Sequence, residues 1–293
     1  MAILFTQKKE EAVKAVSEGY TAVECAYGNE TVVNDRKEPF DHHNVYSGFP
    51  SATLQAFRSD KKVSKIVVNH IDLDCVMASA LLLGKVDRGN RWIRELVNTI
   101  DIVDRSGLGA LSKEQKAGPT GRMVIYNDMQ TDNLVPSKAN FEKAMDIAKQ
   151  FEGGLTKEME AGAEKFDRER VERADEGIVR NKGGVLLVNS DIKGCFDLWY
   201  KKAPVVVVFN SLLKTISIGA TDTKKAEELF GPGGLKNVFP KLDGAWGGRE
   251  SIGGSPRGKE MAFSDAEKAY DTVSGMMKTK KASPDWVGTF LES

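Results

Sequence analysis

The sequence has no apolar run long enough to cross a membrane. Its longest runs, Val76–Leu83 and Pro204–Phe209, are far shorter than the roughly 20 residues that a membrane-spanning helix needs. The opening MAILFTQKKEEAV carries its charges after a short apolar stretch and has no small-residue cleavage site. We therefore expect neither a signal peptide nor association with a membrane.

Cysteine is scarce, and the charges cancel. Cys25, Cys75 and Cys195 are odd in number, lie far apart and form no CxxC motif, which favours a reducing, cytoplasmic location over a disulfide framework. The 42 basic and 42 acidic residues produce no overall positive field that could hold a long polyanion. Any nucleic-acid ligand should therefore be short or bound locally, and long duplex DNA is not expected.

Internal repeats and low-complexity tracts are also absent from the 293 residues. At roughly 100 to 200 residues per domain, this length predicts about two domains. The hydrophobic share of 41% and the charged share of 29% are ordinary for globular proteins. We expect a folded chain with a sizeable core.

The first half of the chain follows an α/β pattern. A buried strand is predicted at Lys65–Asn69, and it stops at the acidic turn His70–Asp74. The other elements expected here are helices over Gln7–Gly19, Ser51–Phe57, Val76–Leu83 and Trp92–Asp104, a hairpin within Tyr20–Asp35, and a strand at Met123–Tyr126.

The second half begins with a charged helical stretch from Asn140 to about Arg180, interrupted at Gly153 and Gly154. Strands are predicted at Gly184–Asn189, Val205–Asn210 and Lys214–Ala220, followed by a glycine-rich segment, Gly231–Gly258, and a closing helix at Asp265–Lys278. The predicted organisation is an α/β domain with a parallel sheet (1–135), bridging helices (136–180) and a smaller α/β domain (181–293).

The three histidines of the chain fall within 29 positions, each beside acidic residues. They form Asp41-His42-His43 and His70-x-Asp72-x-Asp74. Histidine and aspartate together suit Mn, Zn or Fe, and several carboxylates favour harder ions such as Mn or Mg. The pattern indicates a site for two metal ions. The alternative for each motif alone is a capped turn with a buried, hydrogen-bonded histidine.

The segment Gly244–Gly258 is typical of an anion-binding loop. Its glycines let backbone amides approach an anion, and Arg249 and Arg257 supply positive charge. A flexible surface loop is the alternative. Trp246 is expected to pack in the core or at its rim, with stacking on a base as a second interpretation. The spacing Gly253–Lys259 imitates a nucleotide-triphosphate loop, but Glu260 replaces the Ser or Thr that binds magnesium.

These motifs resemble the DHH phosphoesterases. Asp41-His42-His43 followed by Ser51-Ala52-Thr53 resembles the motif that names the family, and Val67–Leu83 resembles its His-x-Asp-x-Asp-Gly motif and helix. Gly244–Gly258 is similar to the glycine-rich signature of the associated DHHA1 substrate domain. Three departures are visible: the motif order is permuted, Cys75 replaces a glycine, and Arg249 replaces a histidine.

The resemblance implies a role for each matching residue. Asp41, His43 and Asp72 would be catalytic, with His43 at the scissile phosphate. The implied metal ligands are His42, His70, Asp72, Asp74 and Asp101, and the remaining bridging carboxylate would be Glu24, Asp35 or Asp104. The implied substrate-binding residues are Gly247, Gly248, Arg249, Gly253, Gly254, Ser255 and Arg257.

The function that the resemblance implies is metal-dependent phosphoester hydrolysis. Two Mn²⁺ ions, or Mg²⁺ or another divalent metal, would activate a water that attacks phosphorus. The expected substrates are short single-stranded oligonucleotides, linear dinucleotides or nucleotide phosphates, and a homodimer is left open. The alternatives are a non-catalytic nucleotide-binding protein of the same fold and a phosphatase or exopolyphosphatase.

Overall fold

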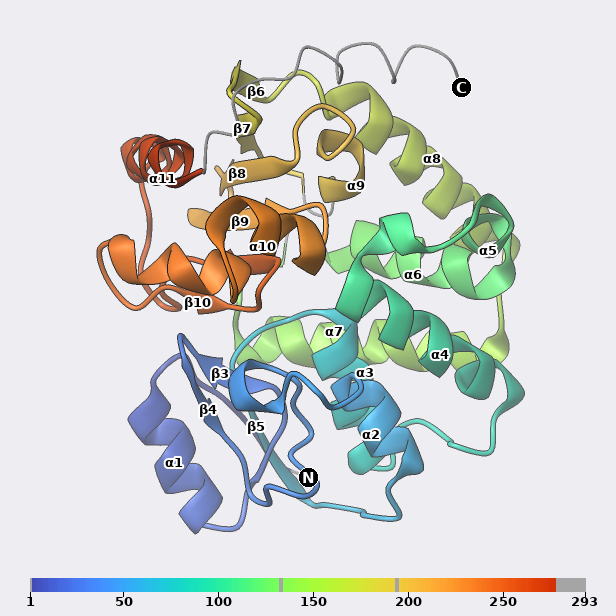
Figure 1. The fold of residues 1–293 in the computed structure, drawn as a ribbon. Coiled ribbons are helices and arrows are strands. Elements are labelled where there is room, and N and C mark those ends of the chain that lie inside the picture. The colour runs from blue at the N-terminus through green and yellow to red at the C-terminus, as the bar shows by residue number, and fades with distance from the viewer. Residues whose placement is uncertain (1, 132–133, 193–194, 278–293) are drawn as a thin grey trace.

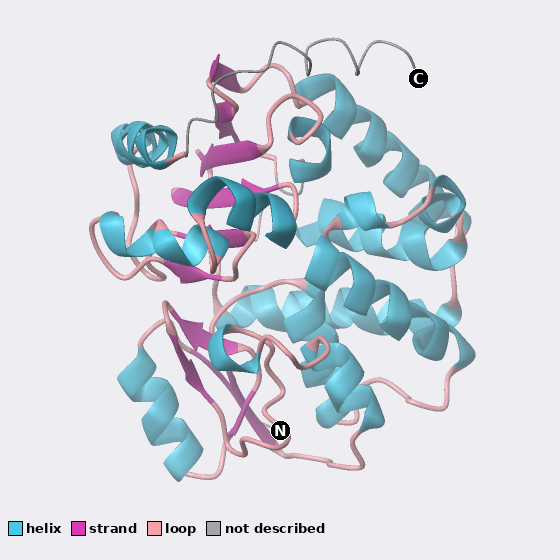
Figure 2. Ribbon diagram, viewed as in Figure 1, coloured by secondary structure: helices cyan, strands magenta, loops and turns pink. Residues whose placement is uncertain are grey.

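The computed structural model describes residues 2–131, 134–192 and 195–277, and it is a mixed α/β structure with two main sheets. Figures 1 and 2 show a small sheet near the N-terminus, a larger sheet formed by the second half of the chain, and helices beside both. The two sheets have separate hydrophobic cores. We call the part built on the first core (2–163) the N-terminal lobe and the part built on the second sheet (174–277) the C-terminal lobe.

The N-terminal sheet is parallel and centres on β5 (Lys65–Val68), which lies between β1 (Ala2–Phe5) and β2 (Thr21–Ala22). Val67 packs on α1 (Lys9–Ser17), whereas Ile66 and Val68 face the main core with α3 (Leu73–Leu82) and α7 (Lys138–Gln150). Burial on both faces explains why β5 is a continuous β-branched run. The predicted hairpin is β3 (Cys25–Tyr27) with β4 (Glu30–Val32).

Helices complete the N-terminal lobe: α2 (Ala52–Arg58), α4 (Arg91–Ser106), α5 (Lys113–Ala117) and α6 (Pro119–Thr131). The strand predicted at Met123–Tyr126 is wrong, because this run lies in α6. All four of its residues are buried in the main core, and a short apolar run does not distinguish a buried helix from a strand.

The helix α8 (Lys157–Arg173) connects the two lobes. Its Met159 and Ala163 belong to the core of the N-terminal lobe, and Phe166 also packs against a cluster of the C-terminal lobe. The prediction of helix as far as Arg180 overran its end, because Ile178–Lys182 is strand β6 at the edge of the second sheet. Four of the five residues of β6 are exposed and its sequence does not alternate between polar and apolar residues, so no strand pattern distinguishes it from the charge-rich helical stretch that precedes it.

The C-terminal sheet has the order β10-β11-β9-β8-β7-β6. Only the β7 and β8 pair is parallel. The strands predicted in this half are confirmed as β7 (Val185–Ser190), β8 (Val205–Asn210) and β9 (Thr215–Ala220), and β10 (Gly247–Gly248) and β11 (Ile252–Gly254) extend the sheet.

Helices cover both faces of this sheet. One face packs against α10 (Thr223–Phe230) and α11 (Phe263–Met276), and the other against α9 (Phe196–Trp199). The predicted closing helix corresponds to α11, and Lys278 lies outside the described residues. The short 3-10 helices are η1 (Asn44–Tyr46), η2 (Leu108–Ala110), η3 (Phe151–Gly153), η4 (Gly234–Asn237) and η5 (Phe239–Lys241).

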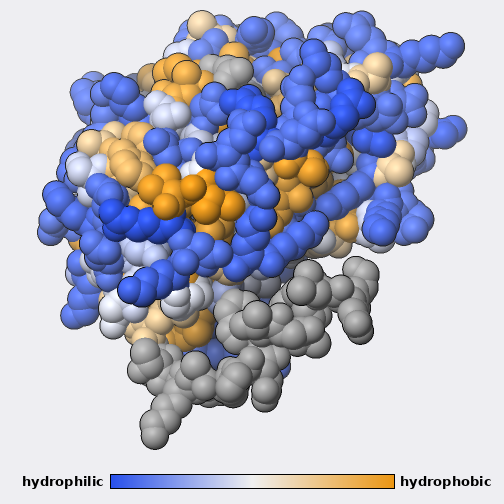
Figure 3. Space-filling view, turned by 90° about the horizontal axis from the view of Figure 1, so that it is seen from above, coloured by the Kyte–Doolittle hydropathy of each residue, from blue (hydrophilic) through white to orange (hydrophobic). Residues whose placement is uncertain are grey.

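Among the residues that the structure describes, no helix has both the length and the apolar character needed to cross a membrane. The face of the molecule seen in Figure 3 is mostly hydrophilic, with apolar side chains in scattered areas.

Candidate metal centre and anion-binding loop

The parallel pairing of β2 with β5 brings two acidic segments to the same edge of the sheet. His70 and Asp72 follow β5, and Glu24 follows β2. Asp72 is the N-cap of α3, where its carboxylate accepts the Cys75 backbone N–H at 2.8 Å. The carboxyl edge of a parallel sheet is where α/β proteins bind ligands.

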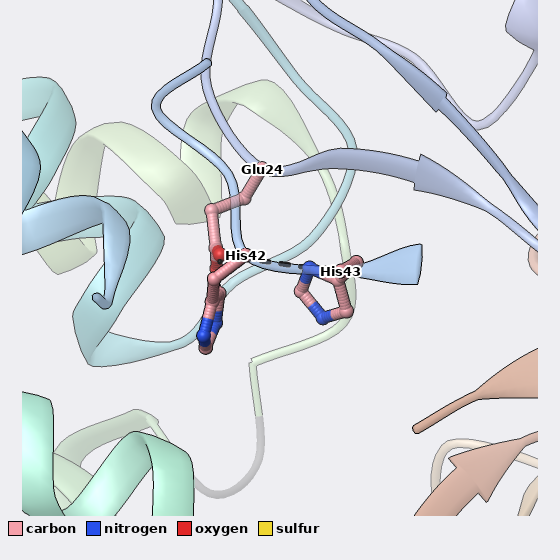
Figure 4. Close-up of side chains that lie close together, drawn as sticks. All are labelled: Glu24, His42 and His43. Carbon is pink, nitrogen blue, oxygen red and sulfur yellow. Dashed lines mark ion pairs between the residues drawn. The ribbon is translucent and has the colours of Figure 1, made fainter. Parts of the chain in front are cut away.

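Glu24 is buried and its backbone lies in the left-handed region, with φ of 52°. This conformation is uncommon for a residue other than glycine and carries strain that surrounding contacts must hold. The backbone N–H of Glu24 donates to the Phe40 carbonyl at 3.0 Å, which ties the turn to the Asp41-His42-His43 loop. Figure 4 shows the Glu24 side chain directed towards the rings of His42 and His43.

The Asp41-His42-His43 loop presents its two imidazoles differently. Asp41 is buried, and its Oδ1 accepts the His43 backbone N–H at 2.7 Å and lies 3.0 Å from His43 Nδ1. His43 is therefore oriented by Asp41, with Nε2 as its remaining ring nitrogen. His42 is almost fully buried and faces the acidic cluster.

Three groups of potential metal ligands overlap in this cluster. His42 Nε2 lies 3.1 Å from Glu24 Oε1, 2.8 Å from Asp104 Oδ2 and 3.8 Å from Asp74 Oδ2. His70 Nε2 lies 3.3 Å from Glu24 Oε2 and 2.8 Å from Asp72 Oδ2. The groups are Glu24, His42 and His43; Glu24, His70 and Asp72; and His42, Asp74 and Asp104, with ligand atoms within 4.8 Å of one another in each.

Burial and the close spacing of charged groups shift the pKa values of several side chains in the cluster. Burial, together with the charges of Glu24 and Asp104, raises the pKa of Asp74 well above its usual value. Burial opposes the charged form of His42, but hydrogen bonds with Asp104 and Glu24 outweigh it and raise the pKa of His42 to about 11. Burial likewise opposes ionisation of Glu24, yet the hydrogen bonds from His42 and His70 hold its pKa well below the usual value.

The residues of this cluster fit a divalent metal. Glu24 Oε1 and Oε2, Asp41 Oδ2 and Asp104 Oδ2 are buried, and apart from the nearby imidazole nitrogens of His42 and His70 they have no hydrogen-bond partner among the described residues. Buried oxygens of this kind need a compensating partner, because desolvating a carboxylate is costly. A cation at the shared imidazole and carboxylate atoms would provide one.

Asp101, the predicted ligand on α4, belongs to none of the three groups. Its Oδ1 accepts the Ser51 backbone N–H at 2.7 Å, and its Oδ2 lies 3.6 Å from Arg105 Nη1. Asp104, one turn further along, is the α4 residue that reaches His42. Helical spacing contained this signal, because Asp104 continues the buried stripe of Ile93, Leu96, Val97 and Ile100.

Of the three bridging carboxylates considered, the structure brings Glu24 and Asp104 into the cluster and places Asp35 in an exposed turn, where it accepts the Lys37 N–H.

Cys75 can replace the glycine of the family motif because its backbone does not need a positive φ. It lies in the first turn of α3. Burial, followed by the charge of Asp72, raises the pKa of this thiol.

Exchanging Asp104 for asparagine should weaken Mn²⁺ binding far more than the same exchange at Asp101. Asp104→Asn removes a negative charge next to His42, whereas Asp101→Asn keeps an amide oxygen that can still accept the Ser51 N–H. We expect a loss of at least about 10-fold at Asp104 and less than about threefold at Asp101. Titration of both variants with Mn²⁺ measures this difference, and equal losses would contradict the geometry described above.

The glycine-rich loop brings the C-terminal lobe against the N-terminal one. Gly247 pairs with Gly254 and Gly248 with Gly253 in the β10–β11 hairpin. A Cβ on Gly247 would lie 2.4 Å from the Gly28 backbone carbon at the tip of the β3–β4 turn. A glycine at 247 is therefore required for the close approach of the two lobes.

Arg249 follows β10 and reaches the acidic cluster. Its Nη2 lies 2.8 Å from His42 Nε2, 3.1 Å from His42 Nδ1 and 3.5 Å from Asp104 Oδ2. A cationic group of one lobe thus sits among potential metal ligands of the other. The sequence placed Arg249 in the loop, but only the folded chain places it beside His42.

A cavity of about 300 Å³ adjoins the cluster, between the two lobes. His43 and His70 line one side, and the opposite side includes the predicted substrate-binding residues Gly247, Gly248, Gly254, Ser255 and Arg257. Two other predicted residues, Arg249 and Gly253, are not among the lining residues. Gly253 instead packs beneath the Phe239 ring, where a Cβ would lie 2.2 Å from Cζ.

The interpretation of Trp246 as a base-stacking platform is wrong. Only 4% of its surface is exposed, and it packs in the core of the C-terminal lobe. Its Nε1 donates to the Asp243 carbonyl at 3.1 Å. A large aromatic side chain beside a glycine-rich loop is here a packing residue that anchors the loop.

Comparisons with known proteins add a distant likeness. No protein-family model matches the sequence, and no curated protein matches it either. Among solved structures, the chain is similar to PggH, a pGpG-specific phosphodiesterase from Vibrio cholerae, with 10% sequence identity and a TM-score of 0.40. The similarity covers 73% of this chain and 80% of that chain.

Proposed function

We propose that this chain is a divalent-metal-dependent phosphoesterase that hydrolyses small phosphorylated nucleotides, namely short oligonucleotides, linear dinucleotides or nucleotide phosphates. The observation that carries the proposal is the convergence of three histidines and four carboxylates on one cluster, which has a buried interior and lies beside a cavity. Asp41 Oδ2 is buried and has no hydrogen-bond partner among the described residues, which buried polar atoms of a purely structural cluster rarely lack. Perturbed pKa values concentrated beside a cavity also favour a functional site.

The chemistry of the ligands favours Mn²⁺, because imidazole and carboxylate are combined. His42, His70, Glu24, Asp72, Asp74 and Asp104 would hold the metal. Glu24 and His42 each belong to two ligand groups, which suits neighbouring ions. Bound ions would supply Lewis acidity and lower the pKa of a water molecule.

Arg249 is the residue suited to binding the reacting phosphoryl group. A guanidinium donates two parallel hydrogen bonds to phosphoryl oxygens and keeps its charge at any physiological pH. Because it lies within 3.5 Å of His42 and Asp104, a phosphate bound to it would lie next to the metal ligands. The negative charge that gathers on the oxygens during attack would meet a fixed positive group.

His43 is suited to contacting the same phosphate from the N-terminal lobe. Asp41 holds its Nδ1, and the ring lines the cavity with Nε2 as its remaining nitrogen. In the protonated ring, Nε2 can donate a hydrogen bond to a phosphoryl or leaving-group oxygen from this position, and in the neutral ring it can accept a proton. Arg257, on the opposite side of the cavity, can bind a further phosphate of the substrate.

The proposal is tested by hydrolysis of a panel: a short RNA, a linear dinucleotide, a nucleoside 3′,5′-bisphosphate and polyphosphate. Each is incubated with Mn²⁺ or with chelator, using the wild type, Asp72→Asn and, as the matched control, Asp35→Asn, whose carboxylate lies outside the cluster. We expect cleavage of nucleotide substrates that requires Mn²⁺, is lost in Asp72→Asn and is retained in Asp35→Asn.

Two other results would redirect the assignment. Stoichiometric Mn²⁺ binding with every substrate left intact would indicate a nucleotide-binding protein of the same fold. Cleavage of polyphosphate in preference to all nucleotides would indicate an exopolyphosphatase, since that substrate has no base or sugar to occupy the cavity.

A further inference from the structure

His70 has a buried partner that the proposed function leaves without a role. Asn69, at the carboxyl end of β5, is completely buried, and its Oδ1 lies 2.6 Å from His70 Nδ1. The other ring nitrogen, Nε2, faces Glu24 at 3.3 Å and Asp72 at 2.8 Å. The two nitrogens of His70 therefore face different groups: one an amide, the other the carboxylates of the cluster.

The orientation of the Asn69 amide is determined by its other contact. Its Nδ2 donates to the Ala26 carbonyl of β3 at 2.6 Å. A backbone carbonyl accepts and never donates, so Nδ2 must face Ala26 and Oδ1 must face His70.

An amide oxygen can only accept, and therefore the nitrogen of His70 beside it must carry a proton. In a neutral imidazole, a proton on Nδ1 leaves Nε2 with its lone pair, and Nε2 is the atom that faces Glu24 and Asp72. The Ala26 carbonyl thus determines the orientation of the Asn69 amide, and the amide oxygen determines which nitrogen of His70 carries the proton.

We propose that Asn69 is a positioning residue that holds His70 in the Nδ1-protonated tautomer, with Nε2 available to a divalent metal. The inference rests on the metal site of the proposed function, but not on hydrolysis. Partners that orient a metal-bound histidine in this way typically contribute 10- to 100-fold to metal affinity. Asn69 would therefore act through His70, without touching the substrate.

The first test is Mn²⁺ affinity, measured on the full chain from the electron paramagnetic resonance signal of free Mn²⁺. Asn69→Leu keeps the approximate volume and removes the acceptor, and we expect a loss of about 10- to 100-fold. Asn69→Asp restores an acceptor for Nδ1–H and should stay within about fivefold of the wild type.

The matched control is Asn127→Leu, which removes another buried amide, one whose Oδ1 has no hydrogen bond in the described structure. It should bind Mn²⁺ like the wild type. Thermal unfolding of all variants identifies any general loss of fold, and a purely structural role for Asn69 would lower the melting temperature without changing the affinity of the folded protein.

The second test is the tautomer itself, observed by ¹⁵N NMR of histidine-labelled protein loaded with diamagnetic Zn²⁺. The chain has three histidines, so His70 can be assigned from the signal lost in His70→Gln. We expect a proton on Nδ1 and none on Nε2 in the wild type. A proton on Nε2, or equal Mn²⁺ affinity in Asn69→Leu, would overturn this inference alone, whereas a wild-type chain that binds no metal would overturn the metal site as well.

Discussion

Replacing Glu24 with glutamine is expected to reduce Mn²⁺-dependent kcat/KM by more than about 100-fold, beyond the usual effect of an outer partner of a metal ligand. Glu24 is shared by two of the three ligand groups, and its two oxygens face His42 and His70 separately. Glutamine keeps the shape of the side chain but removes its charge and one of its acceptor oxygens. Both ligand groups should therefore weaken together.

The measurement pairs kinetics with metal stoichiometry. Glu24→Gln should bind fewer Mn²⁺ ions per chain than the wild type, in addition to losing activity. The matched control is Glu30→Gln on β4, whose carboxylate is 65% exposed and paired with Lys9. Full activity in Glu24→Gln would sink the proposal that this cluster holds the catalytic metal.

Replacing Arg249 with lysine is expected to lower kcat/KM by about 100- to 1000-fold, the range found when one preorganised donor to a developing anion is removed. Lysine retains the charge but cannot form two parallel hydrogen bonds to a phosphoryl group. Arg249→Gln should lose at least as much, because it removes the charge too.

In Arg249→Gln, Mn²⁺ affinity should not fall together with kcat/KM. The guanidinium lies 3.5 Å from Asp104 and 2.8 Å from His42, so removing its charge takes away a repulsion against an incoming cation. We expect Mn²⁺ binding, measured without substrate, to stay equal or become tighter. A loss of metal affinity that parallels the loss of activity would show that Arg249 supports the cluster and does not bind phosphate.

An exposed arginine supplies the control for this pair of variants. Arg173 is 47% exposed and pairs with Asp191 at 2.8 Å, and Arg173→Lys should leave both kcat/KM and Mn²⁺ affinity unchanged. Surface ion pairs of this kind contribute about 0 to 1 kcal/mol to stability. A large effect there would mean that the assay reports general damage to the fold.

The local elements that position the site could be predicted because their signals are local. A β-branched run identified β5, and Ser51 marked the start of α2, where its side chain accepts the Leu54 N–H. The strand predicted at Met123–Tyr126 failed because burial on all sides erases the periodicity that distinguishes helix from strand.

The sequence by itself determined which chemistry was available: three histidines in two acidic motifs, a glycine-rich loop with arginines, and no net charge. Only the tertiary structure decided that Glu24 lies at the centre, that Asp104 and not Asp101 faces His42, and that Arg249 crosses to the other lobe. These placements depend on which strands pair in parallel, on the rotation of α4 and on the approach of Gly247 to Gly28. The strand pairing and the approach of Gly247 to Gly28 are contacts between segments far apart in the chain, so no local pattern of residues specifies them. The helical period of α4 places Asp104 on the buried face, but it does not specify that His42 lies opposite.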